Sequence, residues 1–212
     1  MKKFFIILGI VFIFGISFLI RKHFMINENV LKEQDYELKI DIPDTNYEKL
    51  NSIINNKIKE YILEFKSNIT TEVLEFNSYY SLIIYYKEYN YNNYLSYAFF
   101  VEYFTGGAHP NHDIWTVVFN KDTNDIIGLD YLISKNRNIL NIFSTISRNE
   151  LMYDKGIVDT SMMMEGTRPM KENFSRYVFS NDGIILFFPQ YQVAPYSSGQ
   201  FTVTLPYKSI NF

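Results

Sequence analysis

The chain has 212 residues, enough for one domain or two small ones, and its hydrophobic content of 47% is sufficient for a packed core. The absence of cysteine excludes disulfides, thiol nucleophiles, zinc–thiolate sites and lipid attachment to an N-terminal cysteine. The net charge is -3, and without residues 1–22, which hold four basic and no acidic residues, it is -7. Nucleic-acid binding requires a basic surface and is therefore not expected.

The N-terminal segment predicts a membrane anchor. Residues 4–20 are uncharged and mostly apolar, and basic residues flank this run at 2–3 and 21–22. The run has the length of a short membrane-spanning helix and exceeds a usual signal-peptide core. Bulky residues before Arg21 make a poor cleavage site, so we expect a signal anchor over 1–22, with a cleaved signal peptide as the alternative. The remaining domain is then outside the cytoplasm, in the periplasm or at the cell surface, and is secreted if the leader is removed.

After a short spacer, a strand and a helix are expected. Apolar residues at every second position predict a strand over 36–42, which Pro43 ends. Thr45 and Glu48 have the spacing of a capping box, which satisfies backbone donors at the start of a helix. The helix that follows carries one apolar stripe for burial on a sheet, formed by Leu50, Ile53, Ile54, Ile58, Tyr61, Ile62 and Phe65.

The rest of the chain returns to strand patterns, interrupted by one helix. From residue 73 to 119 the apolar period is two, which predicts an antiparallel meander with a hairpin at 90–93. A helix is expected over 139–152 and a mobile loop over 154–171. Four short strands follow over 174–205, one of them at 190–193, with a hairpin at Asn181-Asp182-Gly183. The predicted class is α+β: antiparallel sheet regions with two main packed helices.

Residues 103–112 form the most distinctive segment, Tyr103-Phe104-Thr105-Gly106-Gly107-Ala108-His109-Pro110-Asn111-His112. The paired glycines permit a tight connection between strands. The two histidines, with Asp113 or Glu102, are too few and too loosely spaced for a metal site, so we expect neither metal nor cofactor. The structural interpretation is a histidine that packs on its own loop. The candidate binding residues here are Tyr103, Gly106, Gly107, His109 and His112.

A second distinctive segment covers residues 188–199. Pro195 and Gly199 fix a turn, and Tyr191 and Tyr196 offer aromatic surface to a sugar or a protein. The alternative is that the tyrosines only buttress the turn. We take Tyr191, Pro195 and Tyr196 as candidate binding residues.

The sequence shows no coherent catalytic set. It has no Gly-x-Ser-x-Gly elbow, no phosphate-cradling loop and no His-Glu-x-x-His motif, so we expect a protein that is not an enzyme. One alternative is a cell-wall-acting hydrolase or deacetylase-like enzyme that uses His109 and nearby carboxylates. Another is a structural or assembly protein of the envelope, which would expose a large apolar patch.

An ordered series of motifs resembles the RsiV-like extracytoplasmic domain family. The motifs are Thr-Gly-Gly-Ala-His-Pro at 105–110, Asn-Asp-Gly at 181–183, Tyr-x-x-Ala-Pro-Tyr-x-x-Gly at 191–199 and Pro-Tyr at 206–207. The family includes the C-terminal domain of a lysozyme-sensing anti-sigma factor, and a related region accompanies PdaC-type peptidoglycan deacetylases. The resemblance spans residues 36–212 and implies two α+β sub-regions, PdaC-like over 23–104 and RsiV-like over 105–212.

The resemblance concerns the external module alone. Only three residues precede the apolar run and no deacetylase region follows the matched part, so we expect neither an anti-sigma nor a deacetylase domain. The resemblance implies lysozyme or peptidoglycan as a partner. Together with the predicted anchor over 1–22, it leads us to expect a membrane-anchored binding module of the bacterial envelope. An acidic domain suits a basic protein such as lysozyme electrostatically.

Overall fold

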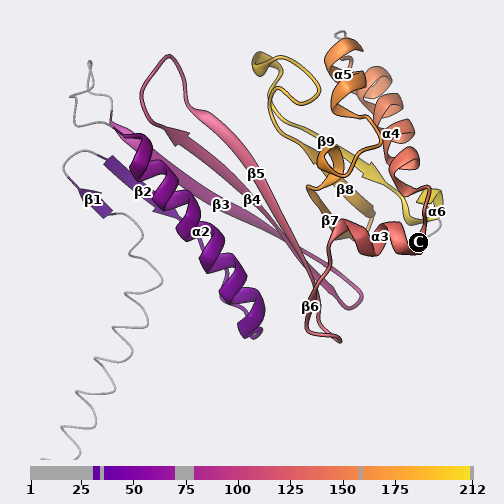
Figure 1. Cartoon of the computed structure of the whole chain (residues 1–212), viewed down its shortest axis with the longest axis horizontal. Helices are drawn as coiled ribbons and strands as arrows, with labels where there is room; N and C mark the ends of the chain where they lie inside the picture. Colours follow the sequence, from indigo (N-terminus) through magenta and orange to yellow (C-terminus); the bar gives the residue numbers. More distant parts are fainter. Residues whose placement is uncertain (1–30, 34–35, 70–78, 158–159, 211–212) are drawn as a thin grey trace, which may run out of the picture.

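The computed structural model describes residues 31–33, 36–69, 79–157 and 160–210. The chain forms two β-sheets and five α-helices over these residues, so the predicted α+β class is confirmed (Figure 1). The predicted anchor over 1–22 lies outside the described residues. Within the described ranges, no helix has both the length and the apolar character needed to cross a bilayer.

The first part of the chain forms a mixed sheet with one long helix, and the second part forms a smaller sheet surrounded by helices. In chain order they are β1 (Leu31–Glu33), β2 (Tyr36–Ile40), α2 (Glu48–Asn68), β3 (Tyr80–Tyr91), β4 (Tyr94–Phe104), β5 (Asn111–Asn120), β6 (Asp125–Ile126), α3 (Leu129–Lys135), α4 (Ile139–Asn149), the π-helix η1 (Glu150–Asp154), α5 (Thr160–Gly166), the 3-10 helix η2 (Glu172–Phe174), β7 (Tyr177–Ser180), β8 (Gly183–Phe188), the 3-10 helix η3 (Tyr196–Ser198), β9 (Phe201–Leu205) and α6 (Tyr207–Ile210).

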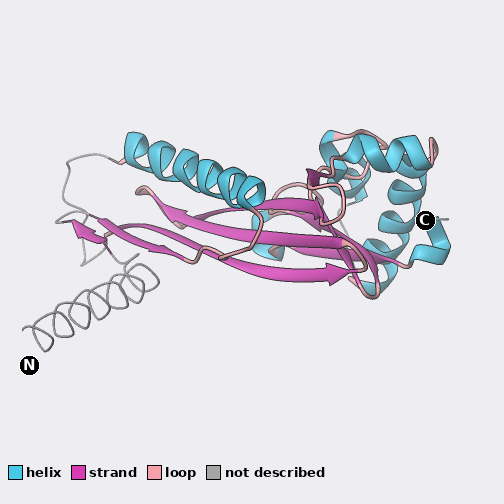
Figure 2. Cartoon of the chain, turned by 90° about the horizontal axis from the view of Figure 1, so that it is seen from below, coloured by secondary structure: helices cyan, strands magenta, loops and turns pink. Residues whose placement is uncertain are grey.

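Sheet A contains β1 to β6 in chain order, and all its pairs are antiparallel except β2 with β3. The parallel pair aligns Tyr36 with Tyr80, and α2 belongs to the connection between these two strands. Helix α2 lies along one face of the sheet (Figure 2). Its predicted stripe is confirmed, because Leu50, Ile54 and Ile58 are buried in one core with the facing side chains of β2 to β5. Sheet A includes strands on both sides of residue 104. The predicted boundary between the two sub-regions at this residue stays a prediction.

The predicted capping box at the start of α2 is wrong. The helix begins at Glu48, and no side chain caps it from the preceding residue, Tyr47. Thr45 instead accepts a hydrogen bond from the Tyr47 N–H at 3.1 Å and donates to Asn51 Oδ1 at 2.6 Å. The helix therefore starts too late for Thr45 to occupy the capping position.

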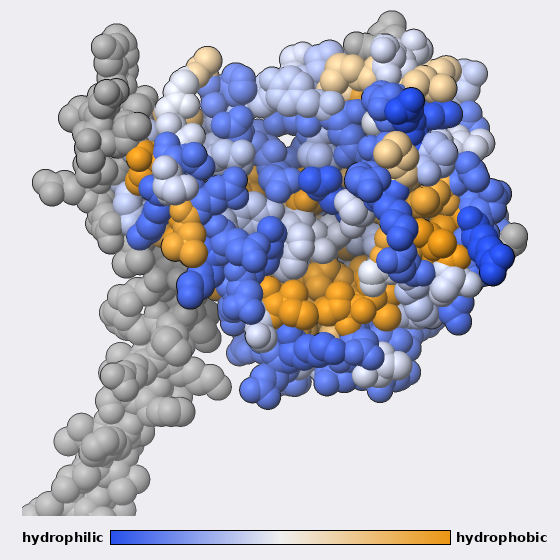
Figure 3. All heavy atoms as spheres, viewed as in Figure 1, coloured by the Kyte–Doolittle hydropathy of each residue, from blue (hydrophilic) through white to orange (hydrophobic). Residues whose placement is uncertain are grey.

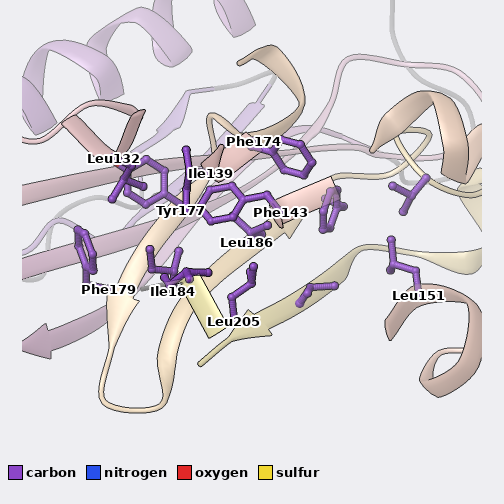
Figure 4. Close-up of a cluster of buried hydrophobic side chains, with 14 of the residues drawn as sticks. Leu132, Ile139, Phe143, Leu151, Phe174, Tyr177, Phe179, Ile184, Leu186 and Leu205 are labelled. Carbon is purple, nitrogen blue, oxygen red and sulfur yellow. The ribbon is translucent and has the colours of Figure 1, made fainter. Parts of the chain in front are cut away.

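Sheet B contains β7, β8 and β9, and helices α3 to α6 gather around it (Figure 1). Side chains from both strands and helices converge in its core (Figure 4). Phe143 of α4, Phe174 of η2 and Phe179 of β7 are at most 1% exposed there. The hairpin predicted at 181–183 is confirmed by the pairing of Ser180 with Gly183.

Two sequence predictions in this half are wrong. Residues 160–166 form helix α5 instead of part of a loop, and Met163 is fully buried. A helix of two turns is too short to show a helical period, and its packing against the core decides its structure. The strand predicted at 190–193 is a turn that leads to η3.

The two sheets meet at β7, which contacts β3, β4 and β5. The Tyr177 N–H donates to Thr116 Oγ1 at 3.0 Å, and the Phe179 N–H donates to Ser96 Oγ at 3.3 Å. Hydroxyl groups of sheet A thus satisfy backbone donors on the edge of sheet B, which are costly to bury unpaired. A small apolar cluster that includes Ala98 packs at the same junction. Elsewhere the face in Figure 3 is largely hydrophilic, with apolar side chains in limited patches.

We predict that Thr116→Val destabilises the fold by about 1–3 kcal/mol, because it leaves the buried Tyr177 N–H without an acceptor while preserving side-chain shape. Urea unfolding followed by circular dichroism measures the change. Thr202→Val, on the exposed side of β9, is the matched control and should change stability by less than about 0.5 kcal/mol. Equal effects of the two variants would contradict the role given to Thr116.

Candidate functional site

A cleft of about 300 Å³ lies between the C-terminal half of α2, sheet A and the segment that follows β8. Its described lining residues are Tyr61, Glu64, Phe65 and Asn68 of α2, Leu82 of β3, Tyr103 of β4, His112 and Asp113 of β5, and Pro189 and Gln190. The two segments singled out in the sequence therefore both reach the cleft. Helix α2 supplies its other wall.

A polar network fixes the inner side of the cleft. The Tyr61 hydroxyl donates to Asp113 Oδ2 at 2.7 Å, and Arg176 Nη2 donates to Asp113 Oδ1 at 3.3 Å. Arg176 Nε also donates to the Ile114 carbonyl oxygen at 2.7 Å, and the Ile114 N–H donates to Asp113 Oδ1 at 2.8 Å. The carboxylate of Asp113 thus joins α2, β5 and the residue before β7.

Burial raises the pKa of the Tyr61 hydroxyl well above its usual value, and the negative charge of Asp113 and the hydrogen bond to it add to the shift. Burial also raises the pKa of Tyr103, with smaller contributions from the charges of Glu64 and Asp113. Both phenols therefore stay protonated at neutral pH and remain hydrogen-bond donors.

Three aromatic rings stand in a row beside the cleft. The rings of His109 and Tyr196 are stacked with centroids 4.0 Å apart, and the ring of Tyr191 lies 5.6 Å from that of Tyr196. We call these three side chains the ring ladder. Tyr196 is 6.3 Å from the ring of His112, and its carbonyl oxygen accepts a hydrogen bond from Gln190 Nε2 at 3.4 Å. Since His112 and Gln190 line the cleft, the ring ladder borders it.

The ring ladder joins the two distinctive segments of the sequence. The Tyr196 hydroxyl donates to the Pro110 carbonyl oxygen at 2.8 Å, and His109 Nδ1 lies 2.9 Å from the same oxygen. His109 thus packs on its own loop, as the structural interpretation expected, and Tyr196 buttresses the contact between the segments. Tyr191 is more open: its ring lies against that of Tyr196, but 59% of its surface is exposed.

The backbone of Tyr191 is left-handed, with φ of +67°. Among the described residues, the other non-glycine positions with positive φ are Asn92 and Asn124, and asparagine tolerates this region. A bulky residue in this region costs of order 1 kcal/mol or more, and such strain is concentrated at functional sites. An exposed tyrosine held in this conformation is therefore costly for the fold alone.

The remaining predicted residues shape the loops. Gly106 and Gly107 have φ of +96° and +107°, so both occupy backbone conformations that favour glycine. Pro195 is exposed and precedes η3. His112 Nδ1 is 3.8 Å from Glu102 Oε2, at the far limit of an ion pair. No three His, Asp or Glu side chains gather closely enough for a metal ion in the described part of the chain.

The segment after β8 is held in place from its other side. Gln192 Nε2 donates to the carbonyl oxygens of Gly166 and Asn173, both at 2.9 Å. A Cβ atom on Gly166 would lie 1.8 Å from the Gln192 carbonyl oxygen, so the close approach requires glycine. Helix α5 therefore positions the segment that carries Tyr191 and Tyr196.

Comparison with known proteins matches two regions of the chain to family models. Residues 130–208 match DUF3298, described as a protein of unknown function. Residues 30–112 match the model described as deacetylase PdaC. The PdaC-related part of the predicted resemblance is thus confirmed, and the carboxyl-terminal region is supported as DUF3298. The RsiV-specific assignment stays a prediction.

A curated relative and two solved structures extend these matches. The chain is 27% identical over 179 residues to the peptidoglycan-N-acetylmuramic acid deacetylase PdaC of Bacillus subtilis strain 168, covering 80% of this chain and 37% of that protein. It therefore spans little more than a third of the relative's length. A DUF3298 family protein of Pseudomonas aeruginosa PAO1 superposes with a TM-score of 0.61 at 13% identity, covering 85% of this chain and 86% of the other, and shares the fold. A DUF3298 family member of Bacteroides fragilis NCTC 9343 gives a TM-score of 0.48 at 19% identity, covering 80% and 70%.

We predict that Tyr61 makes stability depend on alkaline pH. Its pKa is raised above the unfolded value of 10.0, so the folded state holds this proton more tightly. The resulting stabilisation is complete below pH 10 and is lost as the pH rises above it. Urea unfolding between pH 8 and 11, followed by Trp115 fluorescence, should show a free energy of unfolding that falls less steeply above pH 10 in Tyr61→Phe than in the wild type. Equal slopes would show that Tyr61 is not linked to folding.

Proposed function

We propose that this protein is a non-enzymatic binding module of the bacterial cell envelope and that it binds a cell-wall glycan in the cleft and on the ring ladder. The observation that carries the proposal is the position of the ring ladder along the edge of a cleft lined with hydrogen-bonding groups. The site combines residues from both segments that the sequence singled out.

The chemistry of the site suits a sugar. A pyranose ring has an apolar C–H face and polar hydroxyl edges, and the exposed ring of Tyr191 offers a flat surface to such a face. The cleft beside it offers the amide groups of Asn68 and Gln190 and the phenol of Tyr103 to hydroxyl groups. Its volume of about 300 Å³ is at the lower end for a small-ligand pocket.

The geometry favours binding over catalysis. His109 stacks on Tyr196, and its Nδ1 faces a backbone carbonyl oxygen instead of a carboxylate. Asp113 accepts hydrogen bonds from Arg176 and Tyr61, so both of its carboxylate oxygens are engaged inside the protein. A general base must be directed at the proton that it removes, whereas these two groups make contacts that hold the cleft wall and the loop in place.

The similarity to a peptidoglycan-N-acetylmuramic acid deacetylase supports a cell-wall ligand. The region shared with that protein is 37% of its length, and we propose that this region contacts the same polymer. Peptidoglycan lies outside the cytoplasmic membrane, so the proposal includes an extracytoplasmic location. Anchoring through residues 4–20 belongs to the same proposal and rests on the apolar run alone.

We expect the detergent-solubilised full chain to bind soluble peptidoglycan glycan fragments saturably in isothermal titration calorimetry. Tyr191→Ala should weaken binding by about 5- to 30-fold, the effect of losing one stacked ring worth about 1–2 kcal/mol. Tyr153→Ala is the matched control, because Tyr153 is 78% exposed and belongs to neither the cleft nor the ring ladder.

Lysozyme is titrated in parallel. Binding of lysozyme without binding of glycan fragments would replace the glycan with a basic protein as the partner. Equal losses of glycan affinity in Tyr191→Ala and Tyr153→Ala would contradict the assignment of the site to the ring ladder.

A further inference from the structure

The charge of the cleft indicates which kind of sugar it accepts. Two of its described lining residues, Glu64 and Asp113, are acidic, and none of them is lysine or arginine. On the same helix, Lys57 pairs with Glu60 at 3.0 Å with its Nζ 5.0 Å from the centroid of the Tyr61 ring, and Lys66 Nζ lies 5.0 Å from the centroid of the Tyr36 ring. The cleft therefore presents carboxylates to its ligand.

The two carboxylates differ in the groups that neutralise their negative charges. Asp113 has Arg176 and the Tyr61 hydroxyl as partners. Among the described residues, no basic side chain lies within 4.0 Å of the carboxylate of Glu64, which is exposed on α2. Glu64 thus contributes a negative charge at the mouth of the cleft that no described residue neutralises.

Both charges act on the same part of the cleft. The negative charges of Glu64 and Asp113 each raise the pKa of Tyr61 and of Tyr103, the two phenols in its lining. The phenols remain neutral and supply no compensating positive charge. Gln190 adds an amide oxygen that is buried without a hydrogen-bond partner among the described residues. The lining is thus richer in acceptors than in cationic donors.

We propose that the cleft selects an amino sugar whose amine is free and protonated over the same sugar with an N-acetyl group, an inference that rests on the proposed glycan binding. An ammonium group donates charge-assisted hydrogen bonds to carboxylates, whereas an acetamide is neutral. The acetyl group also adds volume in a cleft of about 300 Å³. Sugars that carry only carboxylate or phosphate groups are disfavoured by repulsion from Glu64.

The selected ligand is the product of a definite class of reaction. Hydrolysis of an N-acetylamino sugar breaks the amide C–N bond with one water molecule and gives acetate and a primary amine. The name of the Bacillus subtilis relative describes a deacetylase that acts on N-acetylmuramic acid. We infer that the cleft binds the product of such a deacetylation in preference to its substrate.

The test compares two tetrasaccharides of equal length, one of β-1,4-linked glucosamine and one of β-1,4-linked N-acetylglucosamine, titrated into the detergent-solubilised full chain at low and high salt. We expect the glucosamine tetramer to bind about 10-fold more tightly at low salt, the effect of one charge-assisted hydrogen bond, and the preference to shrink at high salt. Glu64→Gln should reduce the preference to about 2-fold.

Glu48→Gln is the matched control. It removes the same charge from an exposed position of the same helix, about 24 Å away at 1.5 Å per residue, and should leave the preference unchanged. Thermal unfolding of both variants confirms that they are folded. Tetralysine serves as a polycation without a sugar ring, and we expect it to bind at least about 10-fold more weakly than the glucosamine tetramer.

The outcomes separate the two proposals. Equal affinity for the two tetrasaccharides overturns the amine preference and leaves glycan binding standing. A preference that stays as large in Glu64→Gln as in the wild type overturns the assignment to this cleft, and tetralysine binding as tight as that of the glucosamine tetramer overturns the choice of a sugar. Failure of both tetrasaccharides and of peptidoglycan fragments to bind overturns the proposed function itself.

Discussion

Strand β7 and the arginine before it hold the two sheets of this protein together, and the cleft depends on them. The edge of sheet B is bonded to sheet A through the hydroxyls of Thr116 and Ser96 instead of a continuous backbone ladder. Arg176 continues the same junction by bonding the Ile114 carbonyl oxygen and Asp113. Because side chains make these bonds, the two sheets are joined without a ladder pair between them. Asp113 belongs both to this junction and to the lining of the cleft.

The site is assembled from parts that are distant in sequence. Tyr61 and Asp113 are 52 residues apart, and Tyr196 bonds a carbonyl oxygen 86 residues before it. Each contact is long-range, so the surface that we propose for binding requires both sheets to be folded and joined. The contact of Gly166 with Gln192 extends this dependence to α5. We therefore expect a change in the packing of α5 to shift Tyr191 and Tyr196.

Periodicity predicted the α2 stripe, the hairpins and the α+β class, because these features follow from local spacing of apolar and turn residues. The candidate residues of the two distinctive segments were also predicted, and the structure brings His109, Tyr191 and Tyr196 together. The sequence places Tyr61 in the core stripe, since a tyrosine at helical spacing has the same pattern in a core and in a cleft wall. Glu64, Arg176 and Gln190 carry no local signal, because their roles arise from contacts between remote elements.

The left-handed backbone of Tyr191 has a consequence for any attempt to make this protein more robust. Asparagine or glycine at this position would relieve the strain, so selection for heat resistance alone would tend to replace the tyrosine. The stabilised variants recovered in this way would lack the exposed ring that we assign to the ligand. At position 191, thermal stability and the proposed ligand binding therefore favour different residues. A screen that scores only solubility or melting temperature would select variants without the tyrosine ring.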